Sequence, residues 1–573
     1  MNKNGAQLFC EALIREQVDV MFGIPGGVVL PLYDYLNRPE YAQHIKHVLP
    51  KQEQGGGFAA DGYARSTGKV GVALGTSGPG ATNLLTAMEN SMMDSVSVVY
   101  ITGQVTDVLV GTDAFQETDV IGMTLPAVKH SYYVSRAEDV PKVMQAAFYI
   151  ARSGRPGPVH IDFAKDVWIQ VVEESALPPL SERPYLPGYT ERSDRHVTAA
   201  ELMKLQTVLD QPDCRPIVIA GHGVELAGAE AELLQFAEQH NLPVVNTILG
   251  MGCFPQKHPL WYGMIGMHGE AATNYAMAQA NVVISIGSRF DDRITGRVKE
   301  FVADKTFVHF EIDHSEVNKI VPTAVPLVGN LRSTLVQAAQ VLSGHTYPSW
   351  WQHLQSLKQQ YQFRQLPAYN GNYLSQPMIV DAISRATDGQ AIVASDVGRH
   401  QMWLARFYQF AQSRSHLSSG GLGSMGYGVP AAMGAALGNP TREVWAVVGD
   451  GGFMMNVQEL ATLAQLNIPV KIAVMEDKVL GMVHQWQHLL YKGNFSHVDL
   501  HNPDFSKLAK AFGIATWSVA TMAEVEPAIA AARVVPGPAL VVFKVDPNQN
   551  VFPMIPPNTA LNDQALSPED LSK

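Results

Sequence analysis

Short apolar runs, each about one strand long, alternate with helix-like stretches along the whole chain. This alternation is typical of α/β proteins, in which helices connect parallel strands and cover the sheet. At about 100–200 residues per domain, a chain of 573 residues predicts three domains of this kind. We read as buried strands VGVALGT (70–76), VSVVYITG (96–103), GPVHIDF (157–163), RPIVIAGHGV (215–224), NVVISIGSRF (281–290), TFVHFEID (306–313), QAIVASDVG (390–398), REVWAVVGDGG (442–452), VKIAVMED (470–477) and ALVVFKVD (539–546).

Two stretches interrupt this rhythm and predict linkers. Residues 171–195 combine prolines with charges, and residues 343–377 hold SGHTYPSWW, a polar helical segment and LPAYNGNYLSQP. The sequence therefore predicts three consecutive doubly wound parallel-sheet domains followed by a tail. Their predicted bounds are 1–170, 196–342 and 378–546, with the tail at 547–573.

The composition excludes several classes of protein. A net charge of −12 argues against a nucleic-acid partner, since such proteins usually carry basic patches. No apolar run approaches the roughly 18 residues of a membrane span. The chain enters an amphipathic helix at once, without a signal segment, and Cys10, Cys214 and Cys253 form neither a disulfide framework nor a zinc pattern. A reducing, cytoplasmic setting is expected.

A strand that ends in glycines and an acid marks the first candidate site. In VWAVVGDGGFMMNVQELATLAQ (444–465) a buried strand passes through Gly-Asp-Gly-Gly into a helix, where backbone N–H groups favour an anion. Asp450 adds an oxygen ligand suited to Mg²⁺ bound to a diphosphate. A tight turn with a capping Asp is an equal alternative. A second strand end, VKIAVMED, brings Asp477 to the same expected sheet edge 27 residues later.

This spacing of acidic groups resembles the way thiamine diphosphate enzymes hold Mg²⁺ and the cofactor's diphosphate. That superfamily normally has Asn where this chain has Asp477, so an extra negative charge lies near the diphosphate. The stretch KQEQGGGFAADGYAR (51–65) resembles the one whose glutamate bonds the cofactor's aminopyrimidine, which assigns that proton-handling role to Glu53. The alternative is that Glu53 only complements a helix N-terminus.

Nearly the whole chain is similar to the acetohydroxyacid synthase (acetolactate synthase) family of catalytic subunits. The most specific stretches are GTDAFQETD (111–119), GSRFDDRITG (287–296) and LGMVHQWQ (480–487). The resemblance implies a transferase that decarboxylates pyruvate on thiamine diphosphate and joins the hydroxyethyl unit to a second pyruvate or to 2-ketobutyrate. This is the first common step of branched-chain amino acid biosynthesis. It also implies Mg²⁺, and FAD without a net redox role.

The resemblance assigns roles residue by residue. It gives the three domains as a pyrimidine-binding domain, a central FAD-binding domain and a diphosphate- and Mg²⁺-binding domain. The catalytic positions are Glu53, Gln116, Lys165, Arg293 and Met425. The substrate pocket and its mouth are Gly27, Phe115, Met482, Val483 and Trp486. The thiamine diphosphate positions are Pro79, Asn83, Gly398, Arg399, His400, Gly423, Met425, Gly449, Asp450, Gly451, Gly452, Asp477, Leu480 and Gly481. The metal ligands are Asp450, Asp477 and the backbone carbonyl of Val479.

For FAD the corresponding positions are Arg155, Gly221, Gly223, Thr247, His268, Gly287, Arg289, Asp291, Glu311 and Asn330. Asn330 and Leu249 depart from the family's usual residues at their positions. Arg293 is expected to be buried and to receive the carboxylate of the second 2-keto acid, with an ion pair to Asp291 or Asp292 as the alternative. Arg399 stands where the family usually has Gln, and we expect it to offset the charge of Asp477.

Three other functions remain open from the residues. The first is a pyruvate-oxidase-type flavin enzyme, the second a carboligase related to glyoxylate carboligase, and the third a catalytically altered paralogue. Gln52, where the family has His, belongs to the departures that favour the third.

The family also implies partners. The substrates are small 2-keto acids, the assembly is a homodimer or a dimer of dimers, and a small regulatory subunit is expected. The cofactor would lie between the first domain of one subunit and the third domain of another. The tail stretch NVFPMIPPNTALND (550–563) resembles the segment that closes over the active site.

Overall fold

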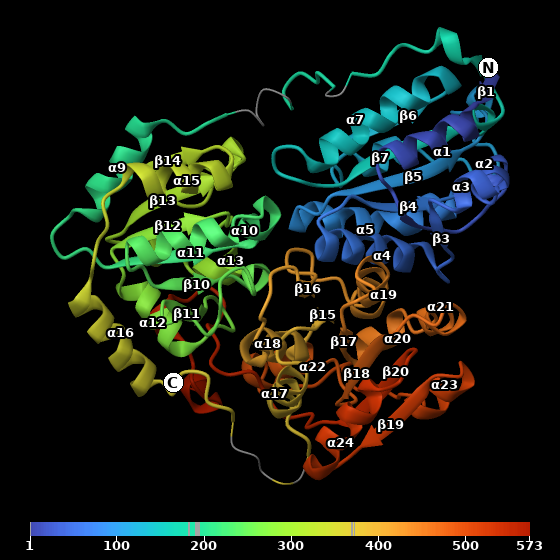
Figure 1. The fold of residues 1–573 in the computed structure, drawn as a ribbon. Helices are drawn as coiled ribbons and strands as arrows, with labels where there is room; N and C mark the ends of the chain where they lie inside the picture. The colour runs from blue at the N-terminus through green and yellow to red at the C-terminus, as the bar shows by residue number, and fades with distance from the viewer. Residues whose placement is uncertain (1, 182–183, 190–194, 368–370, 372, 573) are drawn as a thin grey trace.

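The structure is a computed structural model that describes residues 2–181, 184–189, 195–367, 371 and 373–572. The ribbon forms three α/β units, coloured blue, green and orange to red along the chain (Figure 1). Each unit contains a six-stranded sheet whose strand pairs are all parallel. The predicted fold class is confirmed. Among the described residues, no helix is both long and apolar enough to cross a bilayer.

The N-terminal sheet carries the first set of loops that matter for the site. Its strands, in spatial order, are β3 (Lys46–Val48), β2 (Val20–Gly23), β4 (Gly71–Gly75), β5 (Val98–Gln104), β7 (Val159–Ala164) and β6 (His130–Val134). Its helices are α1 (Gly5–Arg15), α2 (Leu30–Leu36), α3 (Pro39–Ala42), α4 (Glu53–Thr67), α5 (Pro79–Asp94), α6 (Val120–Thr124) and α7 (Val140–Arg152). Strand order reverses between β2 and β4, and ligands bind at such points in open α/β sheets.

The central sheet repeats this plan with its reversal between β9 and β12. The spatial order is β11 (Trp261–Met264), β10 (Val244–Asn246), β9 (Pro216–Ala220), β12 (Val282–Ile286), β13 (Thr306–Glu311) and β14 (Val325–Val328). Its helices are α9 (Ala199–Leu209), α10 (His222–Ala227), α11 (Glu230–Gln239), α12 (Ala271–Gln279), α13 (Asp292–Thr295), α14 (Val298–Val302), α15 (Leu331–Val341) and α16 (Pro348–Gln360).

The C-terminal sheet reverses between β15 and β17. The spatial order is β16 (His416–Ser418), β15 (Ile392–Ser395), β17 (Val444–Gly449), β18 (Val470–Glu476), β20 (Ala539–Lys544) and β19 (Ala515–Val519). Ser395 pairs with Val447 and Gly449 with Met475, so the loops after β15, β17 and β18 leave one edge. The helices are α17 (Gln376–Ala386), α18 (Arg399–Phe407), α19 (Gly428–Gly438), α20 (Asp450–Met455), α21 (Glu459–Gln465), α22 (Gly481–Leu490), α23 (Phe505–Ala511) and α24 (Met522–Arg533).

The glycine-rich helix α4 packs against α19 of the C-terminal unit. A Cβ added at Gly62 would lie 2.6 Å from the Ala431 Cα, and one added at Gly434 would lie 2.9 Å from the Tyr63 nitrogen. The two backbones therefore approach as only glycine permits. This close contact joins the first and third units of one chain.

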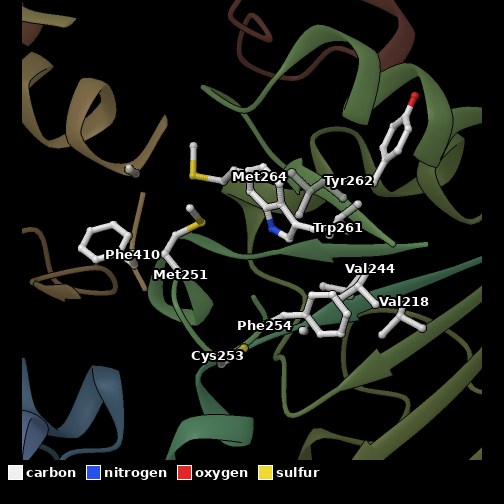
Figure 2. Packing of buried hydrophobic residues seen from close by; sticks show 14 of the residues in the cluster. Val218, Val244, Met251, Cys253, Phe254, Trp261, Tyr262, Met264 and Phe410 are labelled. Atoms are coloured by element: carbon white, nitrogen blue, oxygen red, sulfur yellow. The ribbon is translucent and has the colours of Figure 1, made fainter. Parts of the chain in front are cut away.

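Buried apolar side chains run continuously from the central sheet into the C-terminal one. Figure 2 shows Phe410 of the C-terminal unit beside Met251, with Phe254, Trp261 and Val244 deeper in the central unit. Each such side chain contributes about 1.5–3 kcal/mol when fully buried. The central and C-terminal units are therefore held together by a shared core.

The two predicted linkers are only partly described. Residues 182–183 and 190–194 of the first, and 368–370 and 372 of the second, lie outside the described residues. The remainder of the first contains β8 (Val171–Glu173), which pairs antiparallel with β1 (Asn2–Asn4). The predicted polar helical segment of the second is α16. The red tail returns from β20 to the central unit (Figure 1).

Candidate active site

A cavity of about 850 Å³ opens where the three units meet. Its floor is the reversal point of the central sheet, with Gly223 after β9 and Gly287 after β12. From the C-terminal unit it receives Gly398, Gly423, Met482 and Trp486. Most residues predicted for flavin and three predicted for substrate (Arg293, Met482 and Trp486) thus line one continuous space, together with Gly398 and Gly423 of the fourteen positions predicted for thiamine diphosphate.

All the residues predicted for FAD line this cavity except Gly221. Gly221 packs just behind it, since a Cβ there would lie 2.7 Å from the Ser288 Cβ. A Cβ at Gly223 would lie 2.6 Å from the Gly287 Cα, and Gly287 has a φ of 60°. The strand ends can meet this closely only because both positions are glycine. They leave a backbone-lined cradle of the kind that accepts a dinucleotide phosphate.

Polar groups around the cradle also suit a dinucleotide. The buried His268 Nε2 has no hydrogen-bond partner among the described atoms, and burial lowers the pKa of His268 to about 3, so its ring is neutral. Arg155 is held by Glu316 at 2.8 Å and by the Ser95 hydroxyl at 2.8 Å. Glu311 ends β13, where its Oε1 accepts from the Ile312 N–H at 2.9 Å.

The two departures in this region have simple structural explanations. The Asn330 Oδ1 accepts from the Ser333 N–H at 3.1 Å and caps α15, a task that Asn performs as well as Asp. Leu249 lies on the cavity wall, and a Cβ at Gly420 would lie 2.7 Å from its Cγ. Neither residue closes the cradle.

Arg293 lies at the cavity, but it is not buried as expected. Its side chain is 63% exposed, and its Nη1 lies 3.6 Å from the Asp292 carboxylate. Asp291 accepts from the Arg293 N–H at 2.9 Å and so caps the short helix that carries it. The ion pair considered as an alternative is a weak, exposed one to Asp292, and the guanidinium stays accessible from the cavity.

The loops after β15 and β17 form the second half of the site. The His400 Nε2 accepts from the Gly449 N–H at 3.2 Å. Gly451 lies against the residues predicted around the cofactor, since a Cβ there would be 3.0 Å from Leu480 and 3.5 Å from Met425. The local sequence thus places an anion-accepting helix start beside Met425, which the resemblance assigns to the thiamine diphosphate site.

Asp450 is held firmly at this edge. Its carboxylate accepts from the Gly451 N–H at 2.9 Å, the Lys478 N–H at 2.7 Å and the Asn502 Nδ2 at 2.7 Å. Burial, and then the charge of Asp477, raises the pKa of Asp450 to about 7. A divalent cation would offset the repulsion between these two buried carboxylates, and their oxygens are suitable ligands for it.

Asp477 is paired with Arg399, as expected from the sequence. The Arg399 Nη2 lies 2.6 Å from the Asp477 Oδ2, and the two side chains are 1% and 9% exposed. The second oxygen, Oδ1, accepts from the Val479 N–H at 3.1 Å. The extra negative charge of this chain therefore has its own buried counter-charge.

The N-terminal unit holds a separate group at the β2–β4 reversal. The Glu53 Oε2 accepts from the Asn83 Nδ2 at 3.0 Å, with Pro79 at the start of the same helix. Gln52, not Glu53, caps α4, because its side chain accepts from the Gly55 N–H at 3.3 Å. Glu53 is the first residue of α4, where its charge also complements the helix N-terminus, and the departure at Gln52 has a role in capping that helix.

The other residues predicted in this unit lie on its exposed loops. The Phe115 side chain is 88% exposed, Gln116 has a φ of 61°, and Gly27 and Lys165 are exposed after β2 and β7. Among the described residues, the N-terminal unit lends the cavity only the stretches 93–95 and 152–156. One chain does not bring the Glu53 group to the cavity.

Two residues that the sequence analysis missed hold the site together. Asp396, buried after β15, accepts from the Gly426 and Gly428 N–H groups at 3.0 Å each, which fixes the loop that carries Met425. Burial raises the pKa of Asp396 to about 6. Asn502 bonds Asp450 from 52 residues away. The only signal was the SDVG motif after a strand for Asp396, and the sequence holds none for Asn502.

The sequence matches three domain families described as the N-terminal TPP binding domain, the central domain and the C-terminal TPP binding domain of thiamine pyrophosphate enzymes. The matches cover residues 3–123, 209–338 and 396–543. The chain is 41% identical over 572 residues to the "Acetolactate synthase large subunit" of Corynebacterium glutamicum, covering 98% of this chain and 89% of that one. It is 39% identical over 557 residues to the "Acetolactate synthase isozyme 1 large subunit" of Escherichia coli, covering 97% and 96%. The "Probable acetolactate synthase large subunit" of Methanocaldococcus jannaschii is 39% identical over 567 residues, covering 98% and 94%.

Proposed function

Because this chain belongs to the thiamine pyrophosphate enzymes, and within them to the acetolactate synthase large subunits, we propose that it joins two 2-keto acids at the cavity described above. The donor is pyruvate, and the acceptor is a second pyruvate or 2-ketobutyrate. The observation that carries this proposal is that Arg293, Met482 and Trp486 line the same cavity as the glycine cradle and Gly398. The product would enter branched-chain amino acid biosynthesis.

Three cofactors are proposed, each with its own residues. Asp450, Asp477 and the Val479 carbonyl would hold Mg²⁺, and the glycine-rich starts of α18 and α20 would hold the diphosphate. Gly223, Gly287 and their neighbours in the cavity would hold FAD. Bound thiamine diphosphate supplies the electron sink that lets a 2-keto acid lose CO₂.

The chain's own side chains position the reactants and handle the protons. Glu53, oriented by Asn83, can take and return one proton at its Oε2. The accessible guanidinium of Arg293 binds the planar carboxylate of the acceptor. Trp486 gives the acceptor's alkyl group an apolar wall, at about 0.8 kcal/mol per buried CH₂, which favours 2-ketobutyrate over pyruvate.

The proposed assembly follows from the place of Glu53. Within one chain Glu53 does not reach the cavity, so a complete site would take the N-terminal unit of a second copy, in a homodimer or a dimer of dimers. The relatives are named large subunits, and on that ground we also propose a small regulatory partner. The setting proposed is the cytoplasm.

One assay tests the function directly. The purified chain, supplied with thiamine diphosphate, Mg²⁺, FAD and pyruvate, should form acetolactate. Glu53→Gln should lower kcat roughly 10²- to 10⁴-fold, the range for loss of one proton-transferring group. Glu526→Gln, which changes a carboxylate that is 67% exposed, is the matched control and should keep full activity. A wild-type chain that binds the cofactors but forms no acetolactate would refute the proposal.

A further inference from the structure

Arg399 makes two unrelated kinds of contact. It is the first residue of α18, and its side chain is 1% exposed. Its Nη2 donates to the Asp477 Oδ2 at 2.6 Å, at the proposed cation site. Its Nη1 donates to the backbone carbonyl of Pro547 at 2.8 Å and, more weakly, to that of Gln549 at 3.4 Å. Pairing with Asp477 alone leaves this second set of contacts unexplained.

Pro547 opens a segment that we call the C-terminal strap, residues 547–566. The strap is fixed to the C-terminal unit at several successive points. Arg406 lies two turns after Arg399 on α18, and its Nη1 donates to the Phe552 carbonyl at 2.7 Å. The Gln485 amide on α22 bonds both main-chain groups of Val551, at 2.8 and 3.2 Å. Two arginines of one helix thus dock the strap from the same side.

The strap continues to the substrate side of the cavity. The Ile555 N–H donates to the Met267 carbonyl at 2.8 Å, and the Met267 N–H donates to the Arg293 carbonyl at 2.7 Å. Further on, the Arg297 N–H donates to the Thr559 carbonyl at 2.9 Å. The strap therefore connects the helix that begins at the proposed cation site with the helix that carries the substrate arginine.

The space around the guanidinium is fitted to Arg399. A Cβ at Gly481 would lie 2.5 Å from the Arg399 Nε and 2.9 Å from the Asp477 Oδ2. Only glycine at the start of α22 therefore leaves room for the pair. The guanidinium's planar fork suits two partners in different directions, which a lysine ammonium does not offer in fixed geometry.

We propose that Arg399 is a positioning residue with two duties: it fixes the Asp477 carboxylate at the cation site, and it docks the start of the C-terminal strap. One side chain then links the cation site to the order of the strap. The identity of the cation as Mg²⁺ with thiamine diphosphate rests on the proposed function, whereas the docking of the strap does not.

Hydrogen–deuterium exchange on the full-length chain without cofactors tests the docking. The variants are Arg399→Gln, Asp477→Asn and the double variant, with Arg385→Gln as matched control, because Arg385 pairs with Asp381 and Glu526 on the surface. Strap amides should exchange roughly ten- to a hundredfold faster in Arg399→Gln and in the double variant, as expected for loss of a charge-assisted hydrogen bond. They should exchange as in wild type in Asp477→Asn and in the control.

Calorimetric titration with Mg²⁺ and thiamine diphosphate tests the other duty. Arg399→Gln leaves the charge of Asp477 unopposed near the diphosphate and should weaken binding about tenfold or more. Adding Asp477→Asn to that variant should restore the affinity but not the slow exchange of the strap. If the double variant regains affinity while its strap still exchanges fast, Arg399 positions both partners. Charge balance alone would account for the affinity but not for the fast exchange.

Several outcomes would overturn the inference. If the strap amides of Arg399→Gln exchanged as slowly as those of wild type, the docking would be refuted. Faster exchange of the strap in Asp477→Asn alone would also refute it. Unchanged affinity in Arg399→Gln would refute the first duty.

Peptides from β15, β17 and β18 report whether each variant is folded. If Arg399→Gln unfolds, Gly481→Ala, which displaces the guanidinium, should release the strap, and unchanged exchange would then refute the docking. A wild-type chain that binds no thiamine diphosphate would refute the proposed function instead.

Discussion

At the scale of single residues, buried carboxylates determine how the molecule responds to pH. Glu459 on α21 is fully buried against the start of α4. Its carboxylate accepts from the Lys51 N–H at 2.9 Å and from the Thr462 hydroxyl at 3.1 Å. Burial raises the pKa of Glu459 from its ordinary value of 4.5 to about 7. The folded chain therefore holds a proton there that the unfolded chain has already released.

We expect Glu459 to make the free energy of unfolding fall as pH rises from about 4.5 to 7. In that window the folded state binds more protons at this site than the unfolded state, so a rising pH favours unfolding. At about 1.4 kcal/mol per pKa unit, the change amounts to roughly 3 kcal/mol. Denaturant unfolding at pH 5 and at pH 7.5 measures it.

Glu459→Gln should remove the share of the slope that Glu459 contributes, because a neutral amide can still accept from the Lys51 N–H. Asp396 and Asp450, whose pKa values are also raised, should keep theirs. Glu526→Gln, at an exposed carboxylate, should leave the slope intact. If wild type and Glu459→Gln lost stability in parallel between the two pH values, the assignment to Glu459 would be wrong.

At the scale of helices and strands, the contact between α4 and α19 depends on the absence of side chains. Gly62→Ala would place a Cβ 2.6 Å from the Ala431 Cα, where backbone must move. Overpacking of this kind costs about 1–3 kcal/mol and outweighs the gain of about 1 kcal/mol in helix propensity. We expect a lower melting temperature for Gly62→Ala.

Gly27→Ala is the matched control, because a Cβ there would have no neighbour within 4 Å. Its free energy of unfolding should lie within about 0.5 kcal/mol of that of wild type, as is usual for surface substitutions. Equal melting temperatures for Gly62→Ala and wild type would show that the two helices can separate at little cost.

The elements also show what the sequence could and could not predict. The ten apolar runs became strands because each is buried over most of its length, as in β9, β12 and β17. The strands that were missed lie at or next to sheet edges, and they are short, as in β10, or polar, as in β19. The same holds for the site. Local sequence motifs pointed to Asp450 and to the glycines of the cradle. Asn502 and the exposure of Arg293 depend on tertiary contacts between distant segments.

At the scale of the whole molecule, the separation of Glu53 from the cavity predicts that two chains complete one site. Glu53→Gln and Asp450→Asn should each be nearly inactive alone. Mixed in equal amounts and allowed to exchange subunits, they should recover about a quarter of wild-type activity, because half the dimers then contain one intact site of two. Acetolactate formation in the mixture measures this.

Two controls make the mixing experiment decisive. Mixing each variant with itself should restore nothing. Size-exclusion chromatography should show dimers or larger assemblies for both variants. A mixture of dimers that exchange subunits yet stay inactive would mean that the site is built within a single chain.

The ribbon of β1 and β8 brings the two ends of the first α/β unit together. Asn2 pairs with Glu173 and Asn4 with Val171, so the strand that begins this unit lies beside the strand that leaves it. A unit whose two ends lie together can be inserted into another chain, or removed, without a long connection to bridge it. In terms of chain engineering, residues 2–173 are a module whose two ends meet at one place, so grafting this module into another protein would need only short connections.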